Sequence, residues 1–112
     1  MAGKVTIALR QEVKSLLRYG REHARTGSEL ATVMGFKDDR PVRLAIRGLI
    51  ADGLPVAASV NKPLGYFIAS SLDEATEYMR TLKSRLVNDA YRRRDFKLAS
   101  RDILEPYQMA LI

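Results

Sequence analysis

Residues 26–35 constrain the fold most, because one short segment carries both a helix start and a helix stop. Thr26 and Glu29 form a T-x-x-E capping box directly ahead of an apolar run at 30–34. Gly35 follows that run and can adopt the left-handed conformation that ends many helices. The segment therefore predicts a short helix that ends in a tight turn.

A second helix is predicted directly after this turn, from about Arg40 to Asp52. Asp38 or Asp39 is suited to cap its N-terminus, and Pro41 falls in the first helical turn, where its missing N–H costs little. Gly53 marks the end of the helix. Two short helices joined by a glycine-containing turn form a helix-turn-helix unit, whose function depends on the face that the second helix presents.

The predicted helix over 40–52 has two unlike faces. At about 100° per residue, one stripe is apolar and is predicted to be buried: Val42, Ala45, Ile46, Leu49 and Ile50. The opposite face is predicted to be exposed and carries three arginines, a leucine and an alanine: Arg40, Arg43, Leu44, Arg47 and Ala51. Arginine bonds guanine edges or phosphates, and an apolar side chain can meet a thymine methyl group. The pattern favours contact with DNA over a merely solvated basic face.

Further elements are predicted on both sides of this unit. An amphipathic helix is predicted from about Ile7 to Tyr19, followed by a polar connection at 21–25 with an extended residue near Ala24. The β-branched and aromatic runs at 54–60 and 65–70 flank a short turn, and they predict an antiparallel hairpin with a basic tip. Tyr66 and Phe67 of that hairpin are interpreted as packing residues rather than base-stacking platforms.

A long helix follows the hairpin. Ser71 and Glu74 form an S-x-x-E capping box, and helical spacing continues to about Tyr91. Its apolar residues are close to a heptad pattern: Ala75, Met79, Leu82, Leu86 and Ala90. The sequence leaves two uses of this stripe open, a homodimer formed through residues 72–90 or packing back onto the first helix. The apolar segment from Ile103 to Ile112 is expected to dock on its own domain or on a partner.

The segment at about 8–70 resembles a bacterial winged helix-turn-helix domain. It is most similar to the type found at the N-terminus of biotin ligase repressors and in small phage and bacterial regulators. The shared residues are Glu29-Leu30-Ala31, Gly35, Val42, Ile46, Leu49, Gly53 and Gly65-Tyr66. The sequence departs from the usual spacing at Pro41, which stands six residues after the turn glycine. Val42 takes the inward position if the turn is one residue longer.

The resemblance implies an α+β, mostly α fold, with a three-helix core, a two-stranded wing and, here, a long C-terminal helix. The predicted organisation is a winged helix-turn-helix domain at 1–70, a long helix at 71–95 and a basic and apolar tail at 96–112. The resemblance further implies that the helix over 40–52 lies in the major groove. The wing around Lys62 would touch the DNA backbone or minor groove.

These expectations define a set of DNA contacts. The predicted residues are Arg40, Arg43, Leu44, Arg47, Ser28, Lys37, Lys62, Arg92, Arg93 and Arg94. The last three lie with Lys97 in a polar segment that is interpreted either as a solvated or disordered arm or as a supporting phosphate contact. The predicted function is sequence-specific binding of double-stranded DNA by a bacterial or phage transcriptional regulator or nucleoprotein component. Two alternatives are a protein-interaction adaptor, with Leu44 and the apolar C-terminus as contacts, and RNA binding through the basic tail.

Composition is consistent with a polyanionic partner and argues against enzyme chemistry. The 112 residues contain 19 Lys and Arg against 13 Asp and Glu, for a formal net charge of +6. The sequence has no cysteine, which excludes disulfides, thiolate nucleophiles and Cys-ligated metals. His23 is the single histidine and has no partner motif, while Asp38-Asp39 and Ser70-Ser71 are explained by helix capping. No catalytic residue, cofactor or metal is predicted. The sequence also shows no signal peptide or membrane span, so a cytoplasmic location is expected.

Overall fold

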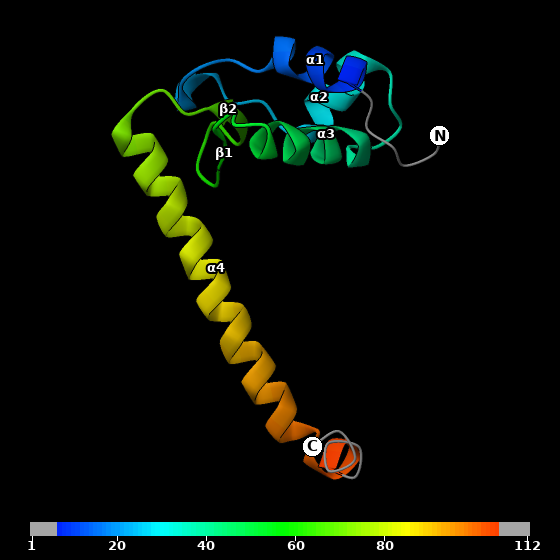
Figure 1. Cartoon of the computed structure of the whole chain (residues 1–112), viewed down its shortest axis with the longest axis vertical. Coiled ribbons are helices and arrows are strands. Elements are labelled where there is room, and N and C mark those ends of the chain that lie inside the picture. Colours follow the sequence, from blue (N-terminus) through cyan, green and yellow to red (C-terminus); the bar gives the residue numbers. More distant parts are fainter. Residues whose placement is uncertain (1–6, 106–112) are drawn as a thin grey trace. The chain divides into compact units, whose positions relative to one another are not determined.

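The computed structural model describes residues 7–105, which form mostly helices with one small sheet (Figure 1). The elements in chain order are α1 (Ile7–Leu16), the 3-10 helix η1 (Arg21–His23), α2 (Gly27–Met34), α3 (Arg40–Ala51), β1 (Val56–Ser59), β2 (Gly65–Ile68) and α4 (Leu72–Ala99). The predicted α+β, mostly α class is confirmed. The chain divides into two units, Met1–Tyr78 and Met79–Ile112. Within the described range, no helix is long and apolar enough to cross a membrane.

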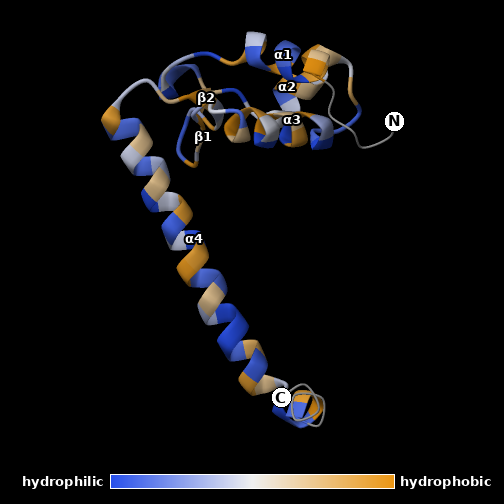
Figure 2. Cartoon of the chain, in the orientation of Figure 1, coloured by the Kyte–Doolittle hydropathy of each residue, from blue (hydrophilic) through white to orange (hydrophobic). Residues whose placement is uncertain are grey.

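The first unit is built around one apolar core, to which α1, α2, α3 and the hairpin all contribute. The buried core residues are Val13, Leu17, Leu30, Ala31, Val42, Ala45, Ile46, Leu49, Val56 and Ile68. In Figure 1, α1 and α2 lie on one side of α3, and both contact it. Figure 2 shows the corresponding alternation of hydrophobic and hydrophilic residues along α3. Removing this apolar surface from water is the main force that holds the three helices together.

The turn between α2 and α3 forms as the sequence predicts. The Thr26 hydroxyl accepts a hydrogen bond from the Glu29 N–H (3.0 Å), and the Glu29 carboxylate accepts one from the Thr26 N–H (3.2 Å). Gly35 adopts the left-handed conformation at φ 81°. At the start of α3, Asp38 accepts a hydrogen bond from the Arg40 N–H (3.0 Å), whereas Asp39 makes no side-chain capping bond. Of the two predicted caps, Asp38 is therefore the one whose side chain bonds the first turn of α3.

The end of the first predicted helix differs from the expectation. We expected the helix to run to about Tyr19, but α1 ends at Leu16. The reason is long-range pairing: Tyr19 forms a bridge with Ile68, and the Gly20 N–H bonds the Ile68 carbonyl (3.0 Å). These contacts with the second strand require extended backbone. Local periodicity does not report them.

The hairpin is shorter than predicted but has the expected topology. β1 and β2 pair antiparallel, with Val56 opposite Ile68 and Ser59 opposite Gly65. The extended residue expected near Ala24 is confirmed, because Ala24 is extended and Arg25 next to it pairs with Tyr66. The β2 strand thus pairs with β1 and also forms an isolated bridge between Tyr66 and Arg25.

The long helix α4 begins at the predicted place and runs further. The Ser71 hydroxyl accepts a hydrogen bond from the Glu74 N–H (3.2 Å), which is half of the predicted capping box. The helix continues beyond Tyr91 through Ala99, so residues 92–97 are helical and exposed, which agrees with a solvated arm and contradicts a disordered one. Arginine, lysine, leucine and alanine in this segment all favour helix, which explains the extension. Of the apolar C-terminus, Ile103 is exposed and Leu104 half-buried, while residues 106–112 lie outside the described range.

Candidate nucleic-acid interface

The α3 helix separates its residues into a buried and an open face. Val42 is fully buried, whereas Pro41 before it is half-buried. Val42 therefore takes the inward position, and the turn is one residue longer than the usual helix-turn-helix spacing. Ala45, Ile46 and Leu49 are also buried. The prediction that Ile50 belongs to this buried stripe is wrong, because 46% of it is exposed. Ile50 stands at the edge of the stripe, where neither α1 nor the hairpin covers it completely.

The outward face of α3 forms one wall of an open hollow of about 520 Å³. The hollow is lined by Arg40, Arg43, Leu44, Ile46, Arg47, Ile50, Tyr66 and Tyr78. Four of the predicted DNA contacts, Arg40, Arg43, Leu44 and Arg47, are therefore brought together. Leu44 is half-buried rather than fully exposed, and Tyr66 joins the lining while it also packs against the core. The result is a basic rim around an apolar and aromatic floor, and we call it the α3 hollow.

Arg43 is held by a carboxylate on its own helix. Its Nε lies 3.1 Å from Oδ1 of Asp39, four residues earlier, and both side chains are partly exposed. Because the ion pair with Asp39 uses Nε, the two terminal amino groups of the guanidinium are left to donate to a second pair of acceptors. Asp39 also places a negative charge at the α3 N-terminus. A phosphate that approached there would meet this charge.

A second arginine joins α1 to the C-terminal end of α3. Arg10 of α1 forms an ion pair with Asp52 at the C-terminal end of α3, with Nη1 and Oδ2 3.0 Å apart. Its guanidinium lies across Gly48, where any Cβ would collide with it. A glycine at this position thus permits the close approach of the Arg10 side chain to α3. The contact links the two helices and leaves the outward face of α3 unobstructed.

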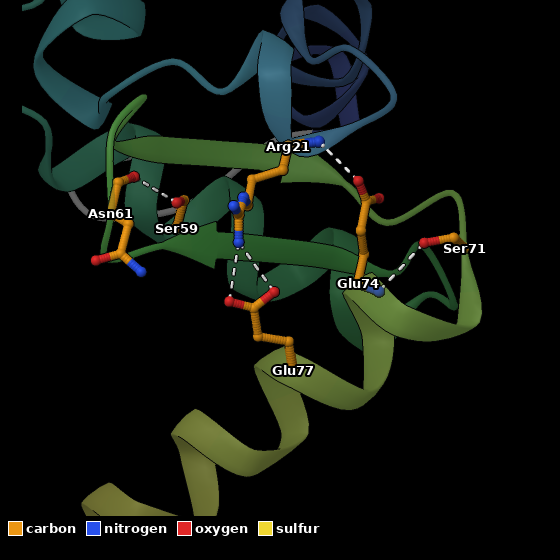
Figure 3. A network of polar contacts seen from close by, with 6 residues as sticks. All are labelled: Arg21, Ser59, Asn61, Ser71, Glu74 and Glu77. Atoms are coloured by element: carbon orange, nitrogen blue, oxygen red, sulfur yellow. Dashed lines mark hydrogen bonds and ion pairs between the residues drawn. The ribbon is translucent and has the colours of Figure 1, made fainter.

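The tip of the hairpin lies in an acidic environment. Lys62 lines a second hollow, of about 390 Å³, with Pro63, Arg21, Glu22, Asp73, Glu74 and Glu77. Four carboxylates and two cationic groups share this region, so the potential around Lys62 is less positive than the sequence of the turn suggests. The tip backbone is fixed by the Ser59 hydroxyl, which donates a hydrogen bond to the Asn61 carbonyl (2.6 Å; Figure 3).

The acidic residues of this second hollow tie the start of α4 to η1 (Figure 3). The Glu74 carboxylate accepts hydrogen bonds from the backbone N–H groups of Ser70 and Arg21, each at 2.9 Å. The Arg21 guanidinium donates to both oxygens of Glu77, at 2.9 and 3.0 Å. The N–H donors of Ser70 and Arg21, in that order, lower the pKa of Glu74 below its ordinary value. These bonds fix the first turns of α4 and with them Tyr78.

The remaining predicted contacts stand apart from the α3 hollow. Ser28 and Lys37 are exposed on α2 and in the turn, and they do not line the hollow. Arg92, Arg93 and Arg94 belong to the second unit and are exposed on α4. There Arg94 pairs with Asp95 (3.3 Å) and lies 5.0 Å from the centre of the Tyr91 ring.

Sequence reasoning does not identify three residues of this site, Asp39 as the partner of Arg43 and Ile50 and Tyr78 in the lining of the hollow. The sequence predicts Asp39 as a cap and Ile50 as a core residue, and it assigns Tyr78 no contact. The i, i+4 spacing of Asp39 and Arg43 is a signal that could have revealed their ion pair. The position of Tyr78 has no such signal, because it depends on how α4 leaves the hairpin.

Among residues 7–105, no group of three or more His, Asp or Glu side chains is arranged to hold a metal ion. His23 is exposed, and its Nε2 lies 3.8 Å from the Glu22 carboxylate. Comparison of the chain with protein-family models, with curated proteins and with solved structures gave no match.

Proposed function

We propose that the chain binds double-stranded DNA through the outward face of α3, as a winged helix-turn-helix protein. In this proposal α1, α2 and α3 are the three-helix core, α3 is the recognition helix, and the β1–β2 hairpin is the wing. The protein acts by occupying a DNA site, as a bacterial or phage transcriptional regulator or nucleoprotein component. The observation that carries the proposal is the gathering of Arg40, Arg43 and Arg47 around one open hollow on α3.

The dimensions and chemistry of this face suit a major groove. From Arg40 to Arg47 is a distance of seven residue steps along the helix, or about 10 Å at 1.5 Å per residue. An α-helix fits the major groove of B-DNA, and arginine is the commonest side chain that contacts guanine there. Leu44 between them supplies an apolar group for a thymine methyl. The burial of Val42 and Leu49 fixes the rotation of α3, so the arginines cannot turn inward.

The acidic surroundings of Lys62 indicate a minor role for the hairpin tip. Four carboxylates line the same hollow as this lysine, and they would repel a phosphate. We therefore assign most of the phosphate contacts to the outward face of α3 rather than to the wing.

The floor of the α3 hollow favours a second candidate, a protein-interaction adaptor. The floor presents apolar and aromatic surface from Leu44, Ile50, Tyr66 and Tyr78, and the phosphates of a DNA backbone would not cover it. In that case the arginines would pair with acidic side chains of a protein partner. The two candidates differ in how strongly binding depends on salt.

Salt titration with a random-sequence duplex tests the proposal. For about five phosphate contacts, log K against log salt should have a slope of about −4 to −5. The triple variant Arg40→Ala, Arg43→Ala, Arg47→Ala should lose most of this binding. Lys14→Ala, on the exposed side of α1, removes a positive charge away from α3 and should change it little. Weak, salt-insensitive duplex binding at low ionic strength would exclude DNA and leave the adaptor.

A further inference from the structure

The second unit carries a stripe of exposed apolar side chains on α4. Met79, Leu82 and Leu86 are 66%, 40% and 72% exposed, and Ala90 continues the same spacing. Separations of three and four residues place these side chains on one face of a helix. We call Met79, Leu82 and Leu86 the α4 stripe. Large apolar side chains that gather on one exposed face typically mark an interaction surface.

The two edges of the α4 stripe are both basic. At about 100° per residue, Lys83 lies on one side of Leu82 and Leu86, and Arg85 lies on the other. Arg92 extends the Arg85 edge one heptad further, and Lys97 extends the Lys83 edge by two. In a helix pair these are the positions whose charges choose the partner. A partner that matches both edges must carry negative charge on both of its own.

A second copy of α4 does not match these charges. In a parallel, in-register pair, Asp89 and Arg93 stand one heptad after Leu82 and Leu86, so each would face its own copy inside the interface. In an antiparallel pair centred on the stripe, Lys83 and Arg85 would each approach their own copies. Like charges in these positions disfavour pairing in either orientation.

Nucleic acid matches the charges but leaves the stripe uncovered. Phosphates pair with lysine and arginine, yet they offer no apolar surface to bury Met79 and Leu86. An amphipathic helix offers both, since its apolar face covers the stripe and its acidic edges pair with the flanking cations. Covering the stripe also removes these side chains from water, which drives association.

We propose that this face of α4 binds an acidic amphipathic helix of another protein. Leucine-type side chains of that helix pack on the α4 stripe, and its carboxylates pair with Lys83 and Arg85. The site lies in the second unit and does not involve the α3 hollow, so it adds a protein-binding function to the proposed DNA-binding one. The two functions can be tested separately.

The test uses the full chain and a synthetic peptide of about three heptads, with leucine at the a and d positions that meet the α4 stripe, lysine and glutamate at the core positions that meet Asp89 and Arg93, and glutamate at e and g. A matched peptide carries lysine in place of glutamate at e and g. Fluorescence anisotropy should show that the glutamate peptide binds at least tenfold more tightly than the lysine peptide. Lys83→Glu with Arg85→Glu should reverse this preference. Such a reversal would not follow from a general loss of structure.

Two further variants separate the stripe from other exposed apolar residues. Leu82→Gln with Leu86→Gln should weaken binding of the glutamate peptide at least tenfold, while circular dichroism shows an unchanged helix content. Leu98→Gln replaces an exposed leucine away from the stripe and should leave binding unchanged.

Three results would overturn the proposal. The first is equal or absent binding of the two peptides. The second is a dimer of the free chain in sedimentation equilibrium that Leu82→Gln with Leu86→Gln dissociates, because the occupant would then be a second copy. The third is binding of duplex DNA that Lys83→Glu with Arg85→Glu weakens tenfold while neither peptide binds, because nucleic acid would then be the ligand of this face.

Discussion

Oδ1 of Asp39 lies 3.1 Å from Nε of Arg43, one helical turn along α3. This contact restrains the Arg43 side chain through Nε and does not use its two terminal amino groups. Guanine presents O6 and N7 as a pair of acceptors that fits two such parallel donors. Under the proposed function, Asp39 therefore positions Arg43 to contact a base rather than the phosphates of the DNA backbone.

Substitutions in this ion pair should change base preference. Arg43→Ala should cost about 1–3 kcal/mol on the preferred duplex and less on random DNA. Asp39→Asn should reduce discrimination at the same base pair by about tenfold, because a neutral amide restrains the guanidinium less than a charged carboxylate does. It should also strengthen binding to random DNA, because a negative charge near phosphates is removed. The measurement compares a duplex selected from a random library with its single-base-pair variants.

Asp52→Asn is the matched control for this prediction. It also removes a carboxylate that pairs with an arginine, but its partner is Arg10 of α1, and neither residue lines the α3 hollow. An unchanged base preference in Asp39→Asn would show that the ion pair only stabilises the helix.

Two glycines with positive φ should respond differently to alanine. Gly65 has φ +124°, and a Cβ there would collide with the backbone of Arg25, whose N–H and carbonyl both bond Tyr66. Gly53 has φ +106° with no atom within 4 Å of the added Cβ. Gly53→Ala should therefore cost only backbone strain, about 1–3 kcal/mol, and Gly65→Ala distinctly more. Urea unfolding of both variants provides the comparison, and equal losses would argue against the close approach of β2 to Arg25.

The buried face of α2 should dominate the stability of the first unit. Leu30 is fully buried, whereas Val33 on the same helix is 59% exposed. Leu30→Ala should lower the free energy of unfolding by about 2–5 kcal/mol. Val33→Ala should change it by about 0.5 kcal/mol or less. Chemical denaturation followed by circular dichroism measures both. A large effect at Val33 would mean that α2 packs with another face.

Acid should weaken the attachment of α4 to η1. The N–H donors of Ser70 and Arg21 hold the pKa of Glu74 below its ordinary value of 4.5. Because the folded-state pKa is the lower one, the ionised carboxylate stabilises the folded state above the unfolded-state pKa. This stabilisation is lost as the pH falls through the folded-state pKa. The difference in unfolding free energy between the wild type and Glu74→Gln should therefore shrink below pH 4.5.

The measurement is urea unfolding of both proteins from neutral pH to about pH 3. Glu12→Gln, at an exposed position on α1, controls for the loss of a surface charge. A difference that stays constant over the whole range would contradict the assignment of the two N–H bonds to an ionised Glu74.

The sequence by itself determined the elements whose signals are local. The capping box at Thr26, the turn at Gly35 and the start of α3 appear where the sequence predicts them. So does the inward position of Val42. Capping bonds and helical periodicity join residues only a few positions apart, so a short stretch of sequence contains all the information that they need.

Only the tertiary structure decided where distant segments meet. The pairing of Tyr19 with Ile68 ended α1 early, and the bonds from Arg21 to Glu74 and Glu77 fixed the start of α4. Ile50 remained 46% exposed although its spacing suits burial, because the elements beside that edge of α3 cover it only in part. Tyr66 and Tyr78 reached the α3 hollow by the same kind of long-range placement. These outcomes depend on the path of the whole chain and on which surfaces it covers, which no local pattern specifies.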